Sequence, residues 1–136
     1  MSTRCITIVK EDGKDLLTFY RHSDGYPTSH GADLKEFLEK HVLVNGIGSG
    51  LAKKKQANGI GCLAASLIKE LKQGPGGIYI VPNGTKGMDE EYLYIISNKE
   101  KQFLLKIYDT SKEEKPVVIY TGTVEGFNPK EVEERK

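Results

Sequence analysis

The densest cluster of residues that could do chemistry lies between positions 20 and 31, where the chain reads YRHSDGYPTSHG. Arg21 can donate paired hydrogen bonds to a phosphate, and the Tyr26 ring can stack on a base. Asp24 opens a predicted turn, and His30 stands just before a predicted helix start, where free backbone N–H groups favour an anion. These residue types in this order favour a site for a small anionic ligand.

Other interpretations of this cluster stay open. In a purely structural one, Asp24 caps its own turn, Arg21 pairs with an acid and the histidines lie on the surface. In a catalytic one, His22 and His30 act as acid and base on a nucleotide phosphodiester, which requires them to converge within about 7 Å. His22, Asp24 and His30 lack the spacing of common metal sites, so no metal is predicted.

The length and charge of the chain argue against several classes of protein. The chain has 136 residues, a length typical of one domain. Its 20 basic and 19 acidic residues leave a net charge of +1. That balance argues against a nucleic-acid-binding protein, which usually carries a basic excess. No apolar run approaches the roughly 18 residues that span a bilayer, and the first 15 residues lack a signal-peptide pattern. We expect a cytoplasmic protein that contacts no membrane, with Cys5 and Cys62 as buried thiols.

The hydrophobic pattern predicts an α+β fold, because strands and helices come in runs. Strands are expected over residues 4–10, 16–21, 78–81, 92–97, 103–108 and 117–121, and helices from residue 31 or 32 and over about 58–72. We expect an antiparallel sheet of five or six strands with both helices packed on one face. The other face would carry tyrosines as a partner or ligand surface, namely Tyr92, Tyr94, Tyr108 and Tyr120.

Two segments stand apart from this pattern. Residues 45–61 contain five glycines and a run of three lysines, which predicts an exposed loop. Residues 129–136 read PKEVEERK and predict a polar tail that frays. The single α+β domain is therefore expected to span residues 1–128.

The opening STRCITIV and the segment FYRHSDGYPTSHGADLKEFL resemble the first type of Thoeris anti-defence proteins, which are small phage proteins. The resemblance implies a non-catalytic sponge in the cytoplasm of an infected host cell. Such a protein binds cyclic ADP-ribose isomers, and in some members cyclic oligonucleotides, and holds them intact without a cofactor. It also implies a homodimer or larger homo-oligomer with ligand sites at subunit interfaces.

A ligand of that class has phosphates, riboses and a base, and each needs its own kind of side chain. Arginines suit the phosphates, an aromatic plane suits the base, and Asp or Asn suits the ribose hydroxyls. The predicted ligand-binding residues are Arg4, Arg21, His22, Asp24, Tyr26, His30, Asn83 and Tyr120. We expect Arg21→Ala to abolish ligand retention and to leave the fold intact.

Two alternatives compete with the sponge. A small phage-encoded inhibitor that binds a host protein would show an exposed tyrosine face and no enclosed polar pocket. A nucleotide phosphodiesterase would show His22 and His30 converging across a pocket.

Overall fold

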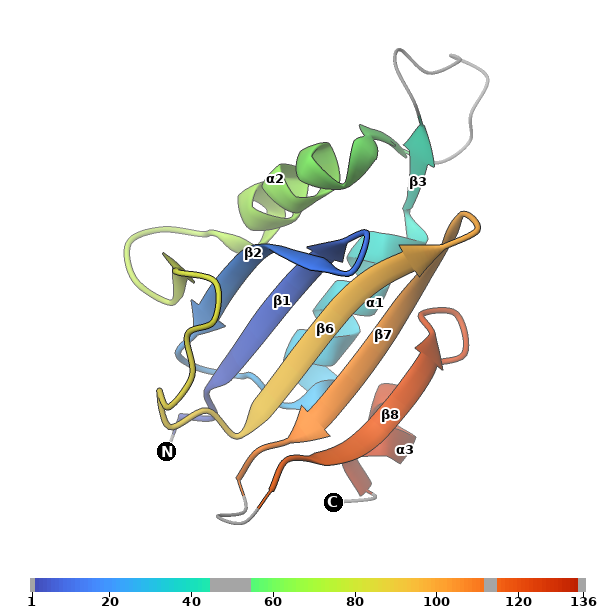
Figure 1. Ribbon diagram of the computed structural model, residues 1–136. Coiled ribbons are helices and arrows are strands. Elements are labelled where there is room, and N and C mark those ends of the chain that lie inside the picture. Colours follow the sequence, from blue (N-terminus) through green and yellow to red (C-terminus); the bar gives the residue numbers. More distant parts are fainter. Residues whose placement is uncertain (1, 45–54, 112–114, 135–136) are drawn as a thin grey trace.

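The computed structural model describes residues 2–44, 55–111 and 115–134 (Figure 1). Its strands are β1 (Cys5–Glu11), β2 (Lys14–Arg21), β3 (His41–Val44), β4 (Lys55–Asn58), β5 (Ile78–Val81), β6 (Tyr92–Lys99), β7 (Gln102–Asp109) and β8 (Val117–Thr123). Its helices are η1, a π-helical turn (Pro27–Gly31), α1 (Ala32–Glu39), α2 (Gly59–Leu71) and α3 (Pro129–Glu134). The predicted strands and the two predicted helices are all present, with ends shifted by a few residues.

Six of the strands form one mixed sheet in the order β5-β2-β1-β6-β7-β8. The α+β prediction with five or six strands is confirmed. All neighbours are antiparallel except β1 and β6, which run parallel and pair Cys5 with Tyr92. The expectation of a wholly antiparallel sheet is therefore wrong for this pair. The cause is the connection over residues 82–91, which leads from the edge strand β5 past β2 and β1 before β6 begins (Figure 1).

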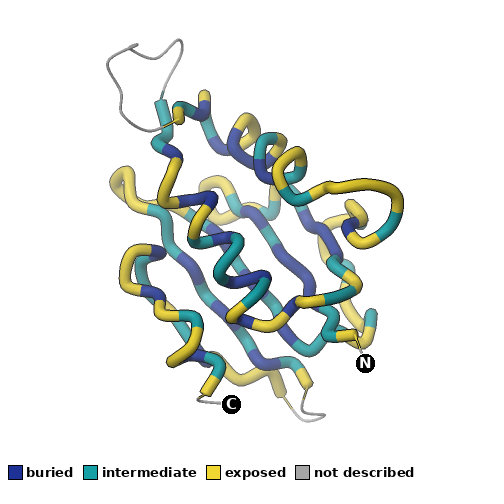
Figure 2. Tube along the Cα trace, turned by 180° about the vertical axis from the view of Figure 1, so that it is seen from behind, coloured by how far each residue is buried: buried dark blue, intermediate teal, exposed yellow. Residues whose placement is uncertain are grey.

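One face of the sheet carries the helices and the hydrophobic core. Seen from behind, α1, α2 and α3 all lie over this face (Figure 2). Apolar residues of α1 and α2 join inward-facing strand residues in one cluster, and Tyr92 and Tyr94 belong to it with 3% and 0% of their surface exposed. The predicted tyrosine face is therefore wrong for these two residues, because the strand register turns them toward the helices.

Residues 55–58 are not the loop that their composition predicts. They form β4, which pairs in parallel with β3 in a separate two-stranded sheet. The rest of the predicted loop before them, residues 45–54, lies outside the described residues.

The predicted C-terminal tail is a helix instead. Residues Pro129–Glu134 form α3, and its Val132 is buried in the core. The Glu133 carboxylate accepts hydrogen bonds from the backbone N–H and the hydroxyl of Thr28, at 3.1 and 2.9 Å. These contacts tie α3 to η1, so the domain continues past residue 128. Among the described residues, no helix combines the length and apolar character needed to cross a bilayer.

Candidate functional site

Arg21 ends β2 on the helix-covered face, and three groups hold its side chain. Its Nε donates to the Ser23 carbonyl oxygen at 2.9 Å, and its Nη1 donates to His30 Nδ1 and to Asp33 Oδ2, each at 3.1 Å. A guanidinium has five N–H donors, so these bonds use three and leave the two on Nη2. The structural interpretation, in which Arg21 pairs with an acid, is confirmed by Asp33. With 19% of its surface exposed, Arg21 can still contact a ligand.

His30 does not line a ligand site, and its prediction as a ligand-binding residue is wrong. Its side chain is fully buried, with Nε2 2.7 Å from Thr7 Oγ1 and the ring 4.8 Å from the Tyr94 ring. Burial and then the neighbouring Arg21 charge lower the pKa of His30 to about 3, so the ring is neutral at physiological pH. From within the core, its Nδ1 contacts Arg21 Nη1 at 3.1 Å.

His22 lies on the opposite face of the sheet from His30. Successive strand side chains alternate between faces, and His22 follows Arg21 to the side of Tyr20. The Tyr20 hydroxyl lies 2.9 Å from His22 Nδ1. The two histidines are therefore separated by the sheet and cannot flank one phosphate, which removes the arrangement that the phosphodiesterase alternative requires.

The Asp24-Gly25 turn is built for close packing against β1. Asp24 has a φ of +61°, and a Cβ on Gly25 would lie 2.8 Å from the Cys5 Cβ. The Gly25 N–H donates to the Thr3 carbonyl oxygen at 2.9 Å, and the Gly25 carbonyl oxygen accepts from the Tyr94 hydroxyl at 2.7 Å. The tight turn and its close packing on β1 therefore explain why Asp24 and Gly25 stand here, without any ligand.

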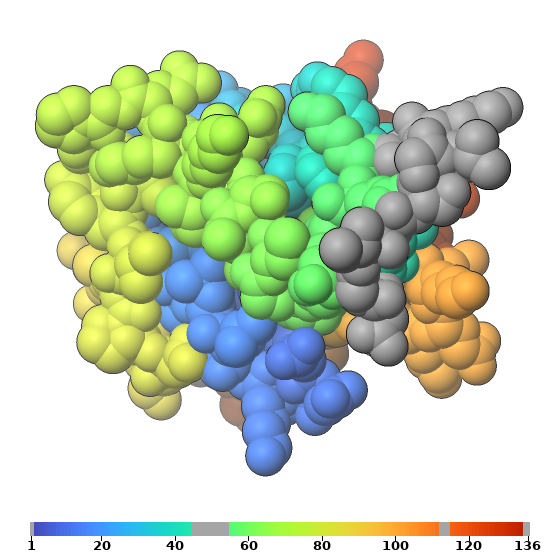
Figure 3. Space-filling view, turned by 90° about the horizontal axis from the view of Figure 1, so that it is seen from above, coloured from blue at the N-terminus to red at the C-terminus, as the bar shows by residue number. Residues whose placement is uncertain are grey.

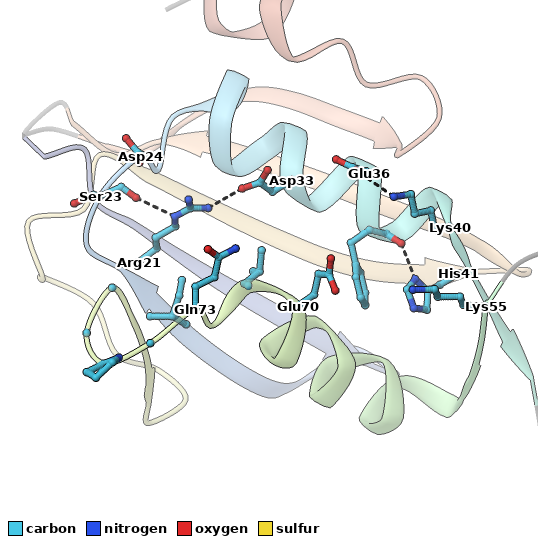
Figure 4. Close-up of a pocket in the computed structure, with 17 residues that line it drawn as sticks. Arg21, Ser23, Asp24, Asp33, Glu36, Lys40, His41, Lys55, Glu70 and Gln73 are labelled. Atoms are coloured by element: carbon cyan, nitrogen blue, oxygen red, sulfur yellow. Dashed lines mark hydrogen bonds and ion pairs between the residues drawn. The ribbon is translucent and has the colours of Figure 1, made fainter.

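A cleft of about 500 Å³ opens beside Arg21, between α1, the end of α2 and the residues that follow α2 (Figure 4). In the view from above, α2 and the segment after it form one flank of the molecule, beside the residues of α1 (Figure 3). The charged and polar residues that line the cleft are Arg21, Ser23, Asp24, Asp33, Glu36, Lys40, His41, Lys55, Glu70 and Gln73. Phe37, Leu71 and Ile78 supply apolar lining, and Gly74–Gly77 closes one end.

Two of the acids in the cleft are neutralised by lining cations. Asp33 pairs with Arg21 at 3.1 Å, and Glu36 pairs with Lys40 Nζ at 2.9 Å. His41 Nδ1 donates to the Phe37 carbonyl oxygen at 2.7 Å, and the two rings stack with centroids 4.1 Å apart. The cleft lining thus combines donors, acceptors and a stacked aromatic pair.

Of the eight predicted ligand-binding residues, the structure brings only Arg21 and Asp24 together in the cleft. Arg4 lies 4.0 Å from Asp89 on the surface. Asn83 accepts from the Thr18 hydroxyl at 2.7 Å, on the face opposite the helices. The Tyr120 hydroxyl donates to the Thr123 carbonyl oxygen at 2.6 Å, and its ring packs on Phe127. The exposed Tyr26 precedes η1 and does not line the cleft.

Sequence reasoning missed the far wall of the cleft. Gln73 and the Gly-Pro-Gly-Gly run of residues 74–77 follow α2, and Gly74 is predicted only as a helix stop. The unusual density of glycine after a helix was the available signal. Three of these glycines, Gly74, Gly76 and Gly77, have positive φ, which brings the chain around beside Arg21.

The cysteines and the metal-ligating residue types add no second site. Cys5 is buried, whereas Cys62 is exposed, so the expectation of two buried thiols is wrong for Cys62. Within residues 2–44, 55–111 and 115–134, no group of three or more His, Cys, Asp or Glu side chains could hold a metal ion. The predicted tyrosine face, which would mark an inhibitor of a host protein, loses Tyr92 and Tyr94 to the core.

Comparisons with known proteins assign no family to this chain. A scan against protein-family models found no match, and searches of curated proteins and of solved structures found no significant similarity.

Proposed function

We propose that this protein is a non-catalytic binding protein that retains a small phosphorylated nucleotide of the cyclic ADP-ribose class in the cleft beside Arg21. The observation that carries the proposal is the cleft itself. Its volume of about 500 Å³ lies within the roughly 300–1,000 Å³ typical of small-molecule sites. It also contains the one predicted arginine that is both held in place and still exposed to a ligand.

Each part of such a ligand has a counterpart in the lining. The two free N–H groups on Arg21 Nη2 can donate to phosphate oxygens. The carboxylates of Asp24 and Glu70 can accept from ribose hydroxyls, and the stacked pair of Phe37 and His41 offers an apolar edge to a base.

The charge balance of the cleft favours a ligand with few phosphates. Its lining holds three cations (Arg21, Lys40, Lys55) and four carboxylates (Asp24, Asp33, Glu36, Glu70), a formal sum of −1 when His41 is left out of the count. A polyphosphate would meet net repulsion there, whereas a molecule that also brings hydroxyl and amino donors uses the carboxylates. This balance suits a ribosylated pyrophosphate better than a triphosphate.

The resemblance to the Thoeris anti-defence proteins supports the same assignment, including a role in immune evasion by a phage and a homodimer or larger homo-oligomer. Gln73, Gly74 and Pro75 line the cleft and are themselves exposed on the surface, so a partner could contact this side. A second subunit is one means of closing that side over a bound ligand.

A bind-and-release assay tests the proposal. The purified protein is mixed with cyclic ADP-ribose isomers and cyclic di- and trinucleotides, filtered, heat-denatured, and the released compounds are analysed by mass spectrometry. An intact compound returned in stoichiometric amount is the expected result. A cleaved product would make the protein an enzyme, and no retained compound would overturn the assignment.

A pair of tryptophan variants locates the site. Gln73 is exposed, lines the cleft and lies near Arg21 (Figure 4), so Gln73→Trp should fill that end and lower retention at least roughly tenfold. Lys69 is an exposed residue of α2 outside the cleft lining, and Lys69→Trp is the matched control. Equal retention by the two variants would place the ligand elsewhere.

A further inference from the structure

A chain of buried hydrogen bonds runs from the centre of the sheet to the cleft. It begins at Thr7 on β1, passes through His30 in η1 and ends at the guanidinium of Arg21. Thr7 and His30 are both fully enclosed, whereas Arg21 reaches the cleft. The chain therefore connects two residues that no ligand can touch with one that a ligand can.

The chemistry of the donors fixes the direction of each bond. An arginine side chain only donates, so His30 Nδ1 must be the acceptor in its 3.1 Å contact with Arg21 Nη1. A neutral imidazole that accepts at Nδ1 carries its proton on Nε2. That proton points to Thr7 Oγ1 at 2.7 Å, so Thr7 accepts from the tautomer that Arg21 requires and stabilises it.

The same contacts fix the orientation of the guanidinium. Ser23 holds Nε from the turn, while His30 and Asp33 hold Nη1 from the core side and from α1. A planar group held at two nitrogens cannot rotate without breaking these bonds. The position of its third nitrogen, Nη2, and of the two N–H donors on it is therefore fixed as well.

We propose that His30 is a positioning residue, which orients the Arg21 guanidinium so that Nη2 faces the ligand, with Thr7 stabilising the His30 tautomer that accepts from Arg21. The role of Arg21 as a ligand contact rests on the proposed function. The orientation itself does not, and it can be measured without any ligand.

Thr7→Val tests the proposal, and Thr18→Val is its matched control. Both threonines are buried and each hydroxyl makes a 2.7 Å hydrogen bond, but Thr18 lies on the opposite face of the sheet and bonds Asn83. Valine keeps the shape of threonine and removes the hydroxyl. The two variants should lose similar stability, and only Thr7→Val should disturb Arg21.

Nitrogen-15 NMR measures both the His30 tautomer and the exchange rate of the Arg21 guanidinium protons. In the wild-type protein we expect one His30 tautomer, protonated on Nε2, and slowly exchanging Arg21 guanidinium protons. Thr7→Val should show mixed tautomers and at least roughly tenfold faster exchange of the guanidinium protons, which corresponds to about 1.4 kcal/mol. Thr18→Val should match the wild type in both signals.

Two substitutions of His30 separate positioning from packing. The His30→Gln side chain has a carbonyl that can accept from Arg21 and an amide that can donate to Thr7, whereas His30→Leu has neither. With cyclic ADP-ribose and its isomers as probes, His30→Gln should keep retention within about threefold of wild type, and His30→Leu should lower it at least roughly tenfold.

The outcomes of the two readouts are distinguishable. If Thr7→Val leaves the tautomer and the guanidinium exchange as in Thr18→Val, the positioning role is wrong whatever the protein binds. If the NMR signals separate the variants as expected but the wild-type protein retains no probe, the positioning stands and the proposed function fails.

Discussion

At the scale of single residues, the buried His30 makes folding stability depend on pH. Burial and the Arg21 charge lower its pKa from 6.5 to about 3, so only the unfolded chain takes up this proton between those values. The His30 contribution to stability is therefore complete above about pH 6.5 and is lost progressively as the pH falls toward 3. Between pH 7.5 and 5.0 this loss amounts to about 2 kcal/mol.

The measurement compares urea unfolding of the wild type and of His30→Gln at these two pH values. Glutamine does not titrate, so the variant should lose less stability on acidification by about that amount. Parallel losses in both proteins would mean that His30 takes up its proton in the folded state.

The bonds of Arg21 also change what Arg21→Ala is expected to do. The substitution leaves the buried His30 Nδ1 without its donor and removes the partner of Asp33. We expect a loss of about 1–3 kcal/mol in unfolding free energy, in addition to lost ligand retention. The expectation of an undisturbed fold, drawn from the sequence, does not take these bonds into account.

Circular dichroism in urea measures this loss, with Arg4→Ala as the control. Arg4 makes a 4.0 Å ion pair with the well-exposed Asp89, and such pairs contribute less than about 1 kcal/mol. If the two alanine variants were equally stable, the three contacts of Arg21 would make no net contribution to the free energy of unfolding.

At the scale of elements, α3 is predicted to stabilise the domain rather than to fray from it. Deletion of residues 129–136 removes the buried Val132 and the Glu133 carboxylate that binds Thr28. We expect a loss of about 1–3 kcal/mol, or a melting temperature lower by roughly 4–12 °C. Scanning calorimetry checks this, with the exposed Lys130→Ala as the control. If the truncated and full chains had the same melting temperature, residues 129–136 would not stabilise the domain.

The six strands of the main sheet and helices α1 and α2 could be predicted, because their signals are local. The alternation that places Leu17, Phe19 and Arg21 on one face of β2 is visible in six consecutive residues, and the structure turns Phe19 into the core. Helix α3 could not be predicted from the hydrophobic pattern, because a single valine, Val132, stands in a charged segment.

The cleft could not be predicted, because distant parts of the chain build it. Arg21 contributes from β2, Lys55 from β4 and Gln73 from beyond α2. Nothing local to these residues indicates that they meet. Of the YRHSDGYPTSHG cluster, Arg21, Ser23 and Asp24 line the cleft, and the buried His30 contacts Arg21.

At the scale of the whole molecule, a ligand that binds only the folded state must raise its melting temperature. For a Kd near about 10 nM and roughly 10 µM free ligand, the added stability is about 4 kcal/mol. In a domain of 136 residues this corresponds to a rise of roughly 12–20 °C. Differential scanning fluorimetry with the retained compound checks the value, and Gln73→Trp should shift far less. A wild-type shift below about 2 °C would exclude tight retention.

The parallel pairing of β1 with β6 has a consequence for synthesis of the chain. Cys5 of β1 pairs with Tyr92, the first residue of β6, which is made much later than β1. When the ribosome has made β1 and β2, these two strands can form a hairpin, but the other edge of β1 still has no partner strand. In the finished sheet this edge lies at the centre, where it pairs with β6. Such late closure slows folding and exposes apolar strand residues in the meantime. The nascent protein should resist protease only after β6 and β7 have left the exit tunnel.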